Sequence, residues 1–253
     1  MNENVFLSVV IPAYKEKDRI GRTLLEIEEY LSKKDFDYEI LVVVDGSPDS
    51  TAEVAGNYTS QVSGLRVIEN KENHGKGYVV RQGLLEARGK YRLFMDADGS
   101  TSITHLDVFL PKMEQEGYDV VIGSRDIEGA FVAVHQPKHR EFMGDMGNWL
   151  IRIVLGLWAY PDTQCGFKML TGYAAQEIAS RMVVDRFGFD FECLVLAKKM
   201  GFRIEQLPVR WLNETGSTVS LFGPNGFVRV LIDLARTRAR LWSGAYRLEM
   251  KKE

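Results

Sequence analysis

Two aspartates, Asp96 and Asp98, follow an apolar run in the segment L-F-M-D-A-D-G-S (93–100). Carboxylates at the point where a buried segment meets a loop are unfavourable unless a cation balances their charge. Hard oxygen ligands of this kind favour Mg²⁺ or Mn²⁺, which can also bind the phosphates of a nucleotide. The pair therefore predicts a divalent metal site that binds a diphosphate, although a D-x-D pattern alone also occurs in unrelated loops.

Two further loops carry groups suited to a nucleoside. Tyr14 and Glu16 follow the first apolar run in V-V-I-P-A-Y-K-E (9–16), and Asp45 follows the second. An aromatic ring can stack on a base, and a carboxylate can accept a hydrogen bond from a base N–H or a ribose hydroxyl. A polar loop and a turn that caps a helix explain the same residues without any ligand.

Basic residues at two more loops could bind phosphate. The segment N-H-G-K-G (73–77) contains Lys76 and two glycines, and it opens a predicted helix whose N-terminus favours an anion. Arg125 ends the segment V-I-G-S-R (121–125), and its guanidinium group can bind phosphate through two hydrogen bonds. The alternatives are a helix cap for the first segment and a surface salt bridge for Arg125.

Alternating strands and helices must position these residues. Short apolar runs rich in β-branched residues are typical of strands buried on both faces. Helical spacing between them predicts a mostly parallel sheet with helices on both faces, which binds ligands at the carboxyl ends of its strands. We expect Pro12 to end the first strand. The predicted strands are residues 7–11, 39–44, 65–68, 92–95 and 119–122, and a helix is predicted over residues 20–31.

The pattern changes after residue 125, within one folded unit. Additional strands are expected near 166–171 and 203–211. Helices are expected over 140–157, 190–200 and 226–246, the last of them long and amphipathic.

Composition excludes several classes of protein. The chain has 253 residues and a net charge of −3, which argues against a general nucleic-acid-binding protein. Cys165 and Cys193 are too few for a disulfide framework and are expected to be buried thiols. The motifs of dinucleotide oxidoreductases, P-loop kinases and serine hydrolases are absent from the sequence. No apolar run reaches the roughly 18 residues that a membrane-spanning helix needs.

Taken in chain order, the segments VIPAYKE, VVDGSPDST, NHGKG, MDADGS and GSR resemble glycosyltransferase family 2, whose members have the Rossmann-like GT-A fold. Later segments resemble the dolichyl-phosphate β-glucosyltransferases of that family: DTQCGFK (162–168), DRFGFDFE (185–192) and WLNETGS (211–217). The related mannose synthases typically have arginine where Glu214 stands and lysine where Thr218 stands, and these two differences favour glucose over mannose. They also typically have a metal-binding glutamine where Ser100 stands, and serine is a weaker candidate ligand.

The resemblance implies a role for each matching residue. Residues 1–125 would bind the nucleotide sugar, residues 126–218 would bind the acceptor, and residues 219–253 would form the amphipathic C-terminal part. The implied nucleotide-binding residues are Pro12, Tyr14, Glu16, Asp45, Lys76 and Asp96; the metal ligands are Asp96, Asp98 and Ser100; and the catalytic residues are Asp98, Arg125 and Arg140, the two arginines binding the acceptor phosphate.

The implied reaction is a metal-dependent, inverting transfer of a hexose to a polyprenyl phosphate such as dolichyl phosphate, with UDP-glucose as the expected donor. A phosphate monoester has a second pKa of about 6, so the attacking oxygen is largely ionised at neutral pH and needs no strong general base. Three alternatives stay open: a mannose synthase using GDP-mannose, a family-2 transferase acting on a glycan hydroxyl with Asp190 as base, and an inactive binding module.

A lipid acceptor requires contact with a membrane. Residues 219–247 carry five arginines against one aspartate, with aromatic and aliphatic residues between them. Amphipathic helices of this composition lie in the interface of anionic membranes, although the same helix could simply cover the core. The expected partners are a nucleotide-sugar donor, a polyprenyl-phosphate lipid, the membrane surface and a membrane protein that recruits the chain, but no nucleic acid. The expected location is cytoplasmic, peripheral on the cytoplasmic face of a membrane.

Overall fold

The computed structural model describes residues 5–133, 138–212, 224–248 and 250, with the backbone alone at 138–143, 224, 225 and 227. In this part of the chain, seven strands form one sheet in the order β3-β2-β1-β4-β7-β5-β8. The strands are β1 (Leu7–Ala13), β2 (Tyr38–Asp45), β3 (Leu65–Asn70), β4 (Tyr91–Met95), β5 (Val120–Ser124), β7 (Phe167–Thr171) and β8 (Ile204–Pro208), with β6 (Phe131–Val132) and β9 (Arg210–Trp211) paired separately.

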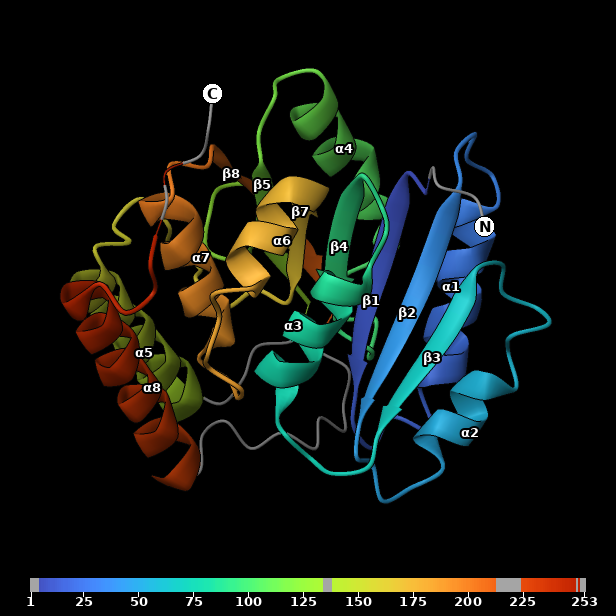
Figure 1. Cartoon of the computed structure of the whole chain (residues 1–253), viewed down its shortest axis with the longest axis horizontal. Coiled ribbons are helices and arrows are strands. Elements are labelled where there is room, and N and C mark those ends of the chain that lie inside the picture. The colour runs from blue at the N-terminus through green and yellow to red at the C-terminus, as the bar shows by residue number, and fades with distance from the viewer. Residues whose placement is uncertain (1–4, 134–137, 213–223, 249, 251–253) are drawn as a thin grey trace.

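Helices cover both faces of the sheet, as the sequence predicts (Figure 1). Val10 of β1 faces one core, and its neighbours Val9 and Ile11 face the other, so the strand is buried on both sides. One core involves α3 (Lys76–Glu86), α5 (Lys138–Leu155), α6 (Gly172–Ala179), α7 (Phe189–Lys199) and α8 (Pro224–Ser243); the other involves α1 (Ile20–Leu31), α2 (Thr51–Gly56), the short η1 (Ile103–His105) and α4 (Leu106–Glu114).

Strand β7 is the exception to the parallel arrangement. It lies between β4 and β5 and runs antiparallel to both. Its first residue, Phe167, pairs with Met95 at the carboxyl end of β4. The segment that leads into β7 therefore reaches the sheet beside Asp96, at the edge where a ligand is expected.

The expectation that Pro12 ends the first strand is wrong. Strand β1 continues to Ala13, and Pro12 pairs with Val43 of β2. The pairing of β1 with β4 stops at Val10, so from Ile11 onward the strand has a neighbour on one side only. An edge of this kind tolerates proline, which has no N–H to donate.

Helices α5 and α8 lie side by side at one end of the molecule, far from β1–β3 (Figure 1). They match the two long helices expected over 140–157 and 226–246. Helix α5 begins and ends two residues earlier than expected, and α8 begins two residues and ends three residues earlier. None of the helices in the described ranges is long and apolar enough to cross a membrane.

Candidate active site

Three of the predicted acidic residues, Glu16, Asp96 and Asp98, lie near one another at the carboxyl edge of the sheet. Burial raises the pKa of Glu16, and the nearby carboxylates of Asp98 and Asp96 raise it further, against the opposing effect of Arg19. The Arg19 Nε donates to Glu16 Oε2 at 2.8 Å. The loops after β1 and β4 therefore place their carboxylates close enough to interact, as their order in the sequence predicts.

Lys76 forms an ion pair with Asp96. The Lys76 Nζ lies 2.6 Å from Asp96 Oδ1, and the lysine is the first residue of α3. Burial opposes the charge of Lys76, but the carboxylates of Asp96 and Asp190 outweigh burial and raise its pKa. The ammonium group is thus a permanent positive charge at the acidic edge, suited to bind a phosphate.

The acidic pair has the chemistry of a metal site completed by substrate. Asp96 and Asp98 are both partly exposed, and Asp98 Oδ1 accepts the Ser100 backbone N–H at 2.9 Å. Mg²⁺ is commonly held by one or two carboxylates together with substrate phosphates. The described residues contain no group of three His, Cys, Asp or Glu side chains able to hold a metal ion. Ser100 is buried beside Asp98, and its role as a ligand stays a prediction.

Asp45 holds the neighbouring loop. Its buried carboxylate accepts the backbone N–H of His74 at 2.7 Å and of Gly75 at 2.8 Å, and also the Asn73 side-chain amide at 2.9 Å. Three hydrogen bonds from residues 73–75 fix the turn from which Lys76 projects. The structure therefore links two predicted segments, while the predicted contact of Asp45 with a nucleoside stays a prediction.

The loop after β1 is tied to the loop after β2. Lys15 adopts a left-handed backbone with φ of 58°, which is unusual for a residue with a side chain. Its N–H donates to Ser47 Oγ at 2.8 Å, and the N–H of Glu16 donates to Thr51 Oγ1 at 2.9 Å. These bonds fix the backbone beside the half-buried Tyr14, whose stacking role stays a prediction.

Arg125 forms an ion pair with Asp162, a partner that the sequence alone did not predict. Its Nε lies 2.8 Å from Asp162 Oδ2 and its Nη2 lies 3.0 Å from Asp162 Oδ1. Burial disfavours the charge on Asp162, yet Arg125 holds the pKa of this carboxyl below its usual range. The predicted phosphate-binding arginine is thus fixed in a bidentate ion pair. The other predicted arginine, Arg140, belongs to α5, and its side chain lies outside the described residues.

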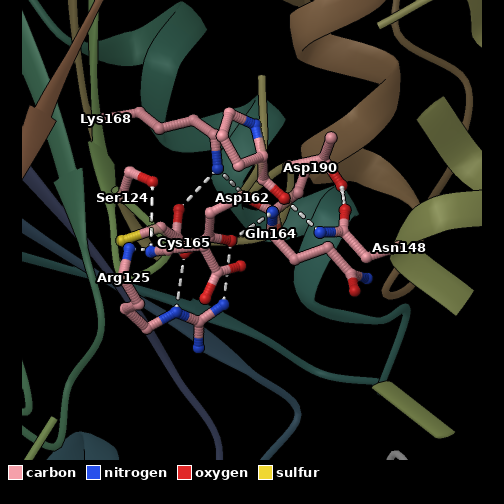
Figure 2. Close-up of polar contacts among 11 residues, drawn as sticks. Ser124, Arg125, Asn148, Asp162, Gln164, Cys165, Lys168 and Asp190 are labelled. Atoms are coloured by element: carbon pink, nitrogen blue, oxygen red, sulfur yellow. Dashed lines mark hydrogen bonds and ion pairs between the residues drawn. The ribbon is translucent and has the colours of Figure 1, made fainter. Parts of the chain in front are cut away.

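A buried network surrounds the segment 162–168 (Figure 2). The Lys168 Nζ donates to the Cys165 carbonyl and to Asp190 Oδ1, each at 2.5 Å, and both charged side chains are buried. Burial raises the pKa of Asp190, against the opposing charges of Lys168 and Lys76. The Thr163 hydroxyl donates a hydrogen bond to Asn148 Oδ1 of α5 at 2.8 Å. The segment is therefore anchored to both α5 and α7.

Gly166 lies directly against the Asp96 carboxylate. A Cβ atom at this position would overlap all three carboxyl atoms of Asp96. The antiparallel direction of β7 produces this contact, because it delivers residues 162–166 to the end of β4. The sequence alone does not indicate a role for Gly166, since glycine has no side-chain chemistry and Asp96 is distant in the chain.

Both cysteines are buried thiols, as expected from the sequence. Burial raises the pKa of Cys165 and of Cys193 to about 12. A thiol with so high a pKa is a poor nucleophile at neutral pH.

Comparisons with known proteins identify the family of the chain. The family model described as "Glycosyl transferase family 2" matches residues 8–178. Dolichyl-phosphate beta-glucosyltransferases of Dictyostelium discoideum and Homo sapiens are 34% and 33% identical to the chain; each match covers 98% of the chain and 78% or 79% of the relative. The relative from Drosophila melanogaster is 36% identical, again over 98% of the chain and 79% of its own length.

Solved structures of lower identity share the fold. Glucosyl-3-phosphoglycerate synthase from Mycobacterium tuberculosis, crystallised with Mn²⁺, UDP and glucosyl-3-phosphoglycerate, is 20% identical with a TM-score of 0.65, over 92% of this chain and 80% of that one. Mannosyl-3-phosphoglycerate synthase from Rubrobacter xylanophilus gives the same identity and TM-score, over 98% of this chain and 77% of that one. The mostly parallel sheet is therefore the predicted GT-A fold, and the chain belongs to glycosyltransferase family 2.

Proposed function

We propose that the protein is an inverting transferase that moves glucose from UDP-glucose to dolichyl phosphate or a similar polyprenyl phosphate. The observation that carries the proposal is the presence of two fixed cationic groups, Lys76 and Arg125, around the carboxylates of one sheet edge. Two cations suit a reaction that brings a diphosphate and a phosphate together. The names of the similar relatives, which are dolichyl-phosphate beta-glucosyltransferases, support transfer of a glucosyl group to dolichyl phosphate.

The donor would bind at the ends of β1, β2 and β4. Tyr14, Glu16 and Asp45 would surround the nucleoside, and Lys76 would bind the diphosphate. Asp96 and Asp98 fit a Mg²⁺ or Mn²⁺ ion, which when bound would neutralise the leaving diphosphate. The Mn²⁺ and UDP in the mycobacterial structure support this assignment, although that protein shares the fold alone.

The acceptor phosphate would lie near Arg125, with Arg140 as a second proposed contact. Because its oxygen is largely ionised at neutral pH, the protein must position it and stabilise charge rather than remove a proton. A sugar hydroxyl would instead need a base, and Asp190 is the candidate. Its Oδ1 is bound to Lys168, which favours the phosphate acceptor over the hydroxyl.

The reaction is tested by incubating the protein with radiolabelled UDP-glucose, Mg²⁺ and dolichyl phosphate. We expect label in the organic phase, and at least a roughly hundredfold loss of it in Asp98→Asn, because the substitution removes a carboxylate proposed to hold the metal ion that would neutralise the diphosphate. GDP-mannose is the matched donor control. Label transferred from GDP-mannose alone would assign the mannose reaction, and a water-soluble product would assign a hydroxyl acceptor.

We further propose that α5 and α8 form a membrane-binding face. Exposed apolar side chains lie on both helices, including Trp149 and Trp242, the latter 88% exposed. Arginines of α8 are exposed among them: Arg229, Arg236, Arg238 and Arg240. Exposed aromatic and basic side chains on neighbouring helices match the interface of an anionic bilayer, where the lipid acceptor would be found.

Vesicle binding tests this face. We expect the protein to sediment with vesicles containing about 30% anionic lipid, and to do so less at high salt, because the arginines contribute through screened charge. Trp242→Ser should weaken binding several-fold. Val108→Ser is the matched control, since Val108 is an exposed apolar residue of α4, on the opposite face of the sheet. Equal losses in the two variants, or no binding by the wild type, would contradict the assignment.

A further inference from the structure

Glu192 is a buried carboxylate that the proposed chemistry does not use. It lies on α7, two residues after Asp190, and its side chain has no exposure to solvent. Its oxygens accept the backbone N–H groups of Val183, at 3.1 Å, and Val184, at 2.9 Å. A fully buried carboxylate is unfavourable unless such donors surround it, so this one needs a structural reason.

The remaining donor comes from the C-terminal end of the described chain. The Tyr246 hydroxyl, three residues beyond α8, donates to Glu192 Oε1 at 2.6 Å, and Tyr246 is itself buried. Nearby, Gly188 packs directly against the Asp233 side chain of α8, so closely that a Cβ atom at Gly188 would lie 2.7 Å from the Asp233 Cβ. The segment 182–188 is therefore held from one side by α7 and α8.

The other side of this segment faces the N-terminal turn of α3. The carbonyl oxygens of Val184 and Asp185 lie so close to Gly77 and Gly75 that neither glycine has room for a Cβ atom. The Tyr78 N–H donates to the Asp185 carbonyl at 3.0 Å.

Arg81, one turn further along α3, extends the contact. It binds the Met182 carbonyl at 2.9 Å and the Asp185 carboxylate at 3.1 Å. The segment 182–188 thus forms the wall behind the turn from which Lys76 reaches Asp96.

From these contacts we propose that Glu192 is a positioning residue for the donor-binding turn, and that the Tyr246 hydroxyl makes the C-terminal segment part of the donor site. Without the hydroxyl, Glu192 loses a donor, the segment 182–188 packs less firmly on Gly75 and Gly77, and Lys76 is less well fixed. The effect should fall on nucleotide binding and on the KM for the donor more than on kcat. The inference rests on the proposed function for the site that binds the nucleotide.

Tyr246→Phe tests the proposal, because it removes one hydroxyl and no packing atoms. Calorimetric titration with UDP in the presence of Mn²⁺, and KM and kcat for UDP-glucose, should show a roughly three- to tenfold weaker binding and higher KM with kcat little changed. Tyr38→Phe is the matched control. Its hydroxyl also donates to a carboxylate, Glu28 Oε2 at 2.9 Å, but it lies among the residues packed on the opposite face of the sheet.

Glu192→Gln provides a second variant of the same contact. The amide keeps the side-chain shape and one acceptor oxygen, so it should weaken UDP binding less than Glu192→Ala does. All variants are assayed well below their unfolding midpoints, so that a general loss of stability is not counted as weaker binding.

The outcomes separate two failures. If the wild type binds UDP, and Tyr246→Phe binds it as tightly as Tyr38→Phe does, this inference is wrong while the proposed function stands. If the wild type binds neither UDP nor GDP, the proposed function and the inference both fail.

Discussion

Gly166→Ala is expected to lower transferase activity by about a hundredfold or more while the protein remains folded. The added Cβ would occupy the position of the Asp96 carboxylate, so either that side chain or the start of β7 must move. Asp96 would then lose its ion pair with Lys76 and its proposed place at the metal and diphosphate. Initial rates, the apparent affinity for Mg²⁺ and thermal unfolding curves measure the effect.

Gly56→Ala is the matched control for this substitution. Gly56 lies at the end of α2, and a Cβ there would meet no atom within 4 Å. Alanine restricts the unfolded chain more than glycine does, so this control should be neutral or slightly stabilising. Activity of Gly166→Ala close to that of Gly56→Ala would show that Asp96 is not held where the site needs it.

Lys168→Met is expected to destabilise the protein by about 3–5 kcal/mol, because it leaves the Asp190 carboxylate buried without its partner. The lysine is 1% exposed and the aspartate 8%, and their charged atoms lie 2.5 Å apart. Urea unfolding followed by fluorescence measures the change. Lys33→Met is the control, since its ion pair with Glu29 is mostly exposed and should contribute less than about 1 kcal/mol.

The double variant Lys168→Met with Asp190→Asn distinguishes stability from catalysis. Removing both charges abolishes the unpaired carboxylate and should recover much of the lost stability. Activity should not recover, because the charge beside Lys76 and Asp96 is also lost. A single Lys168→Met variant as stable as Lys33→Met would contradict the assignment of a buried ion pair.

The parallel half of the fold could be predicted from the sequence because its signals are local. Continuous apolar runs mark strands buried on both faces, and the side chains that follow them must meet at one edge. As this reasoning predicts, the structure places the carboxylates of Glu16, Asp96 and Asp98 close enough to interact at that edge, while their roles in binding stay predictions. Helices α4 and α6 could not be predicted from local signals. Helix α4 contains Pro111, a residue that usually ends a helix, and α6 is only two turns long.

The non-local half of the site could not be predicted in the same way. Whether β7 runs parallel or antiparallel depends on how it packs between β4 and β5, which its five residues do not reveal. The contacts of Gly166 with Asp96, Asp162 with Arg125 and Tyr246 with Glu192 each join residues far apart in the chain. Resemblance to a family marked the segments 162–168 and 185–192, but only the structure shows what these residues hold.

The direction of β7 has an evolutionary consequence. The chain leaves the sheet at Ser124 and returns at Phe167, and both points lie at the same edge. The excursion between them, which includes α5, need not cross the sheet, and longer loops are closed at little additional entropic cost. Descendants of an ancestral gene could therefore exchange or extend residues 126–161 and acquire new acceptors, while Gly166 and the strands that carry the donor-side residues keep their places.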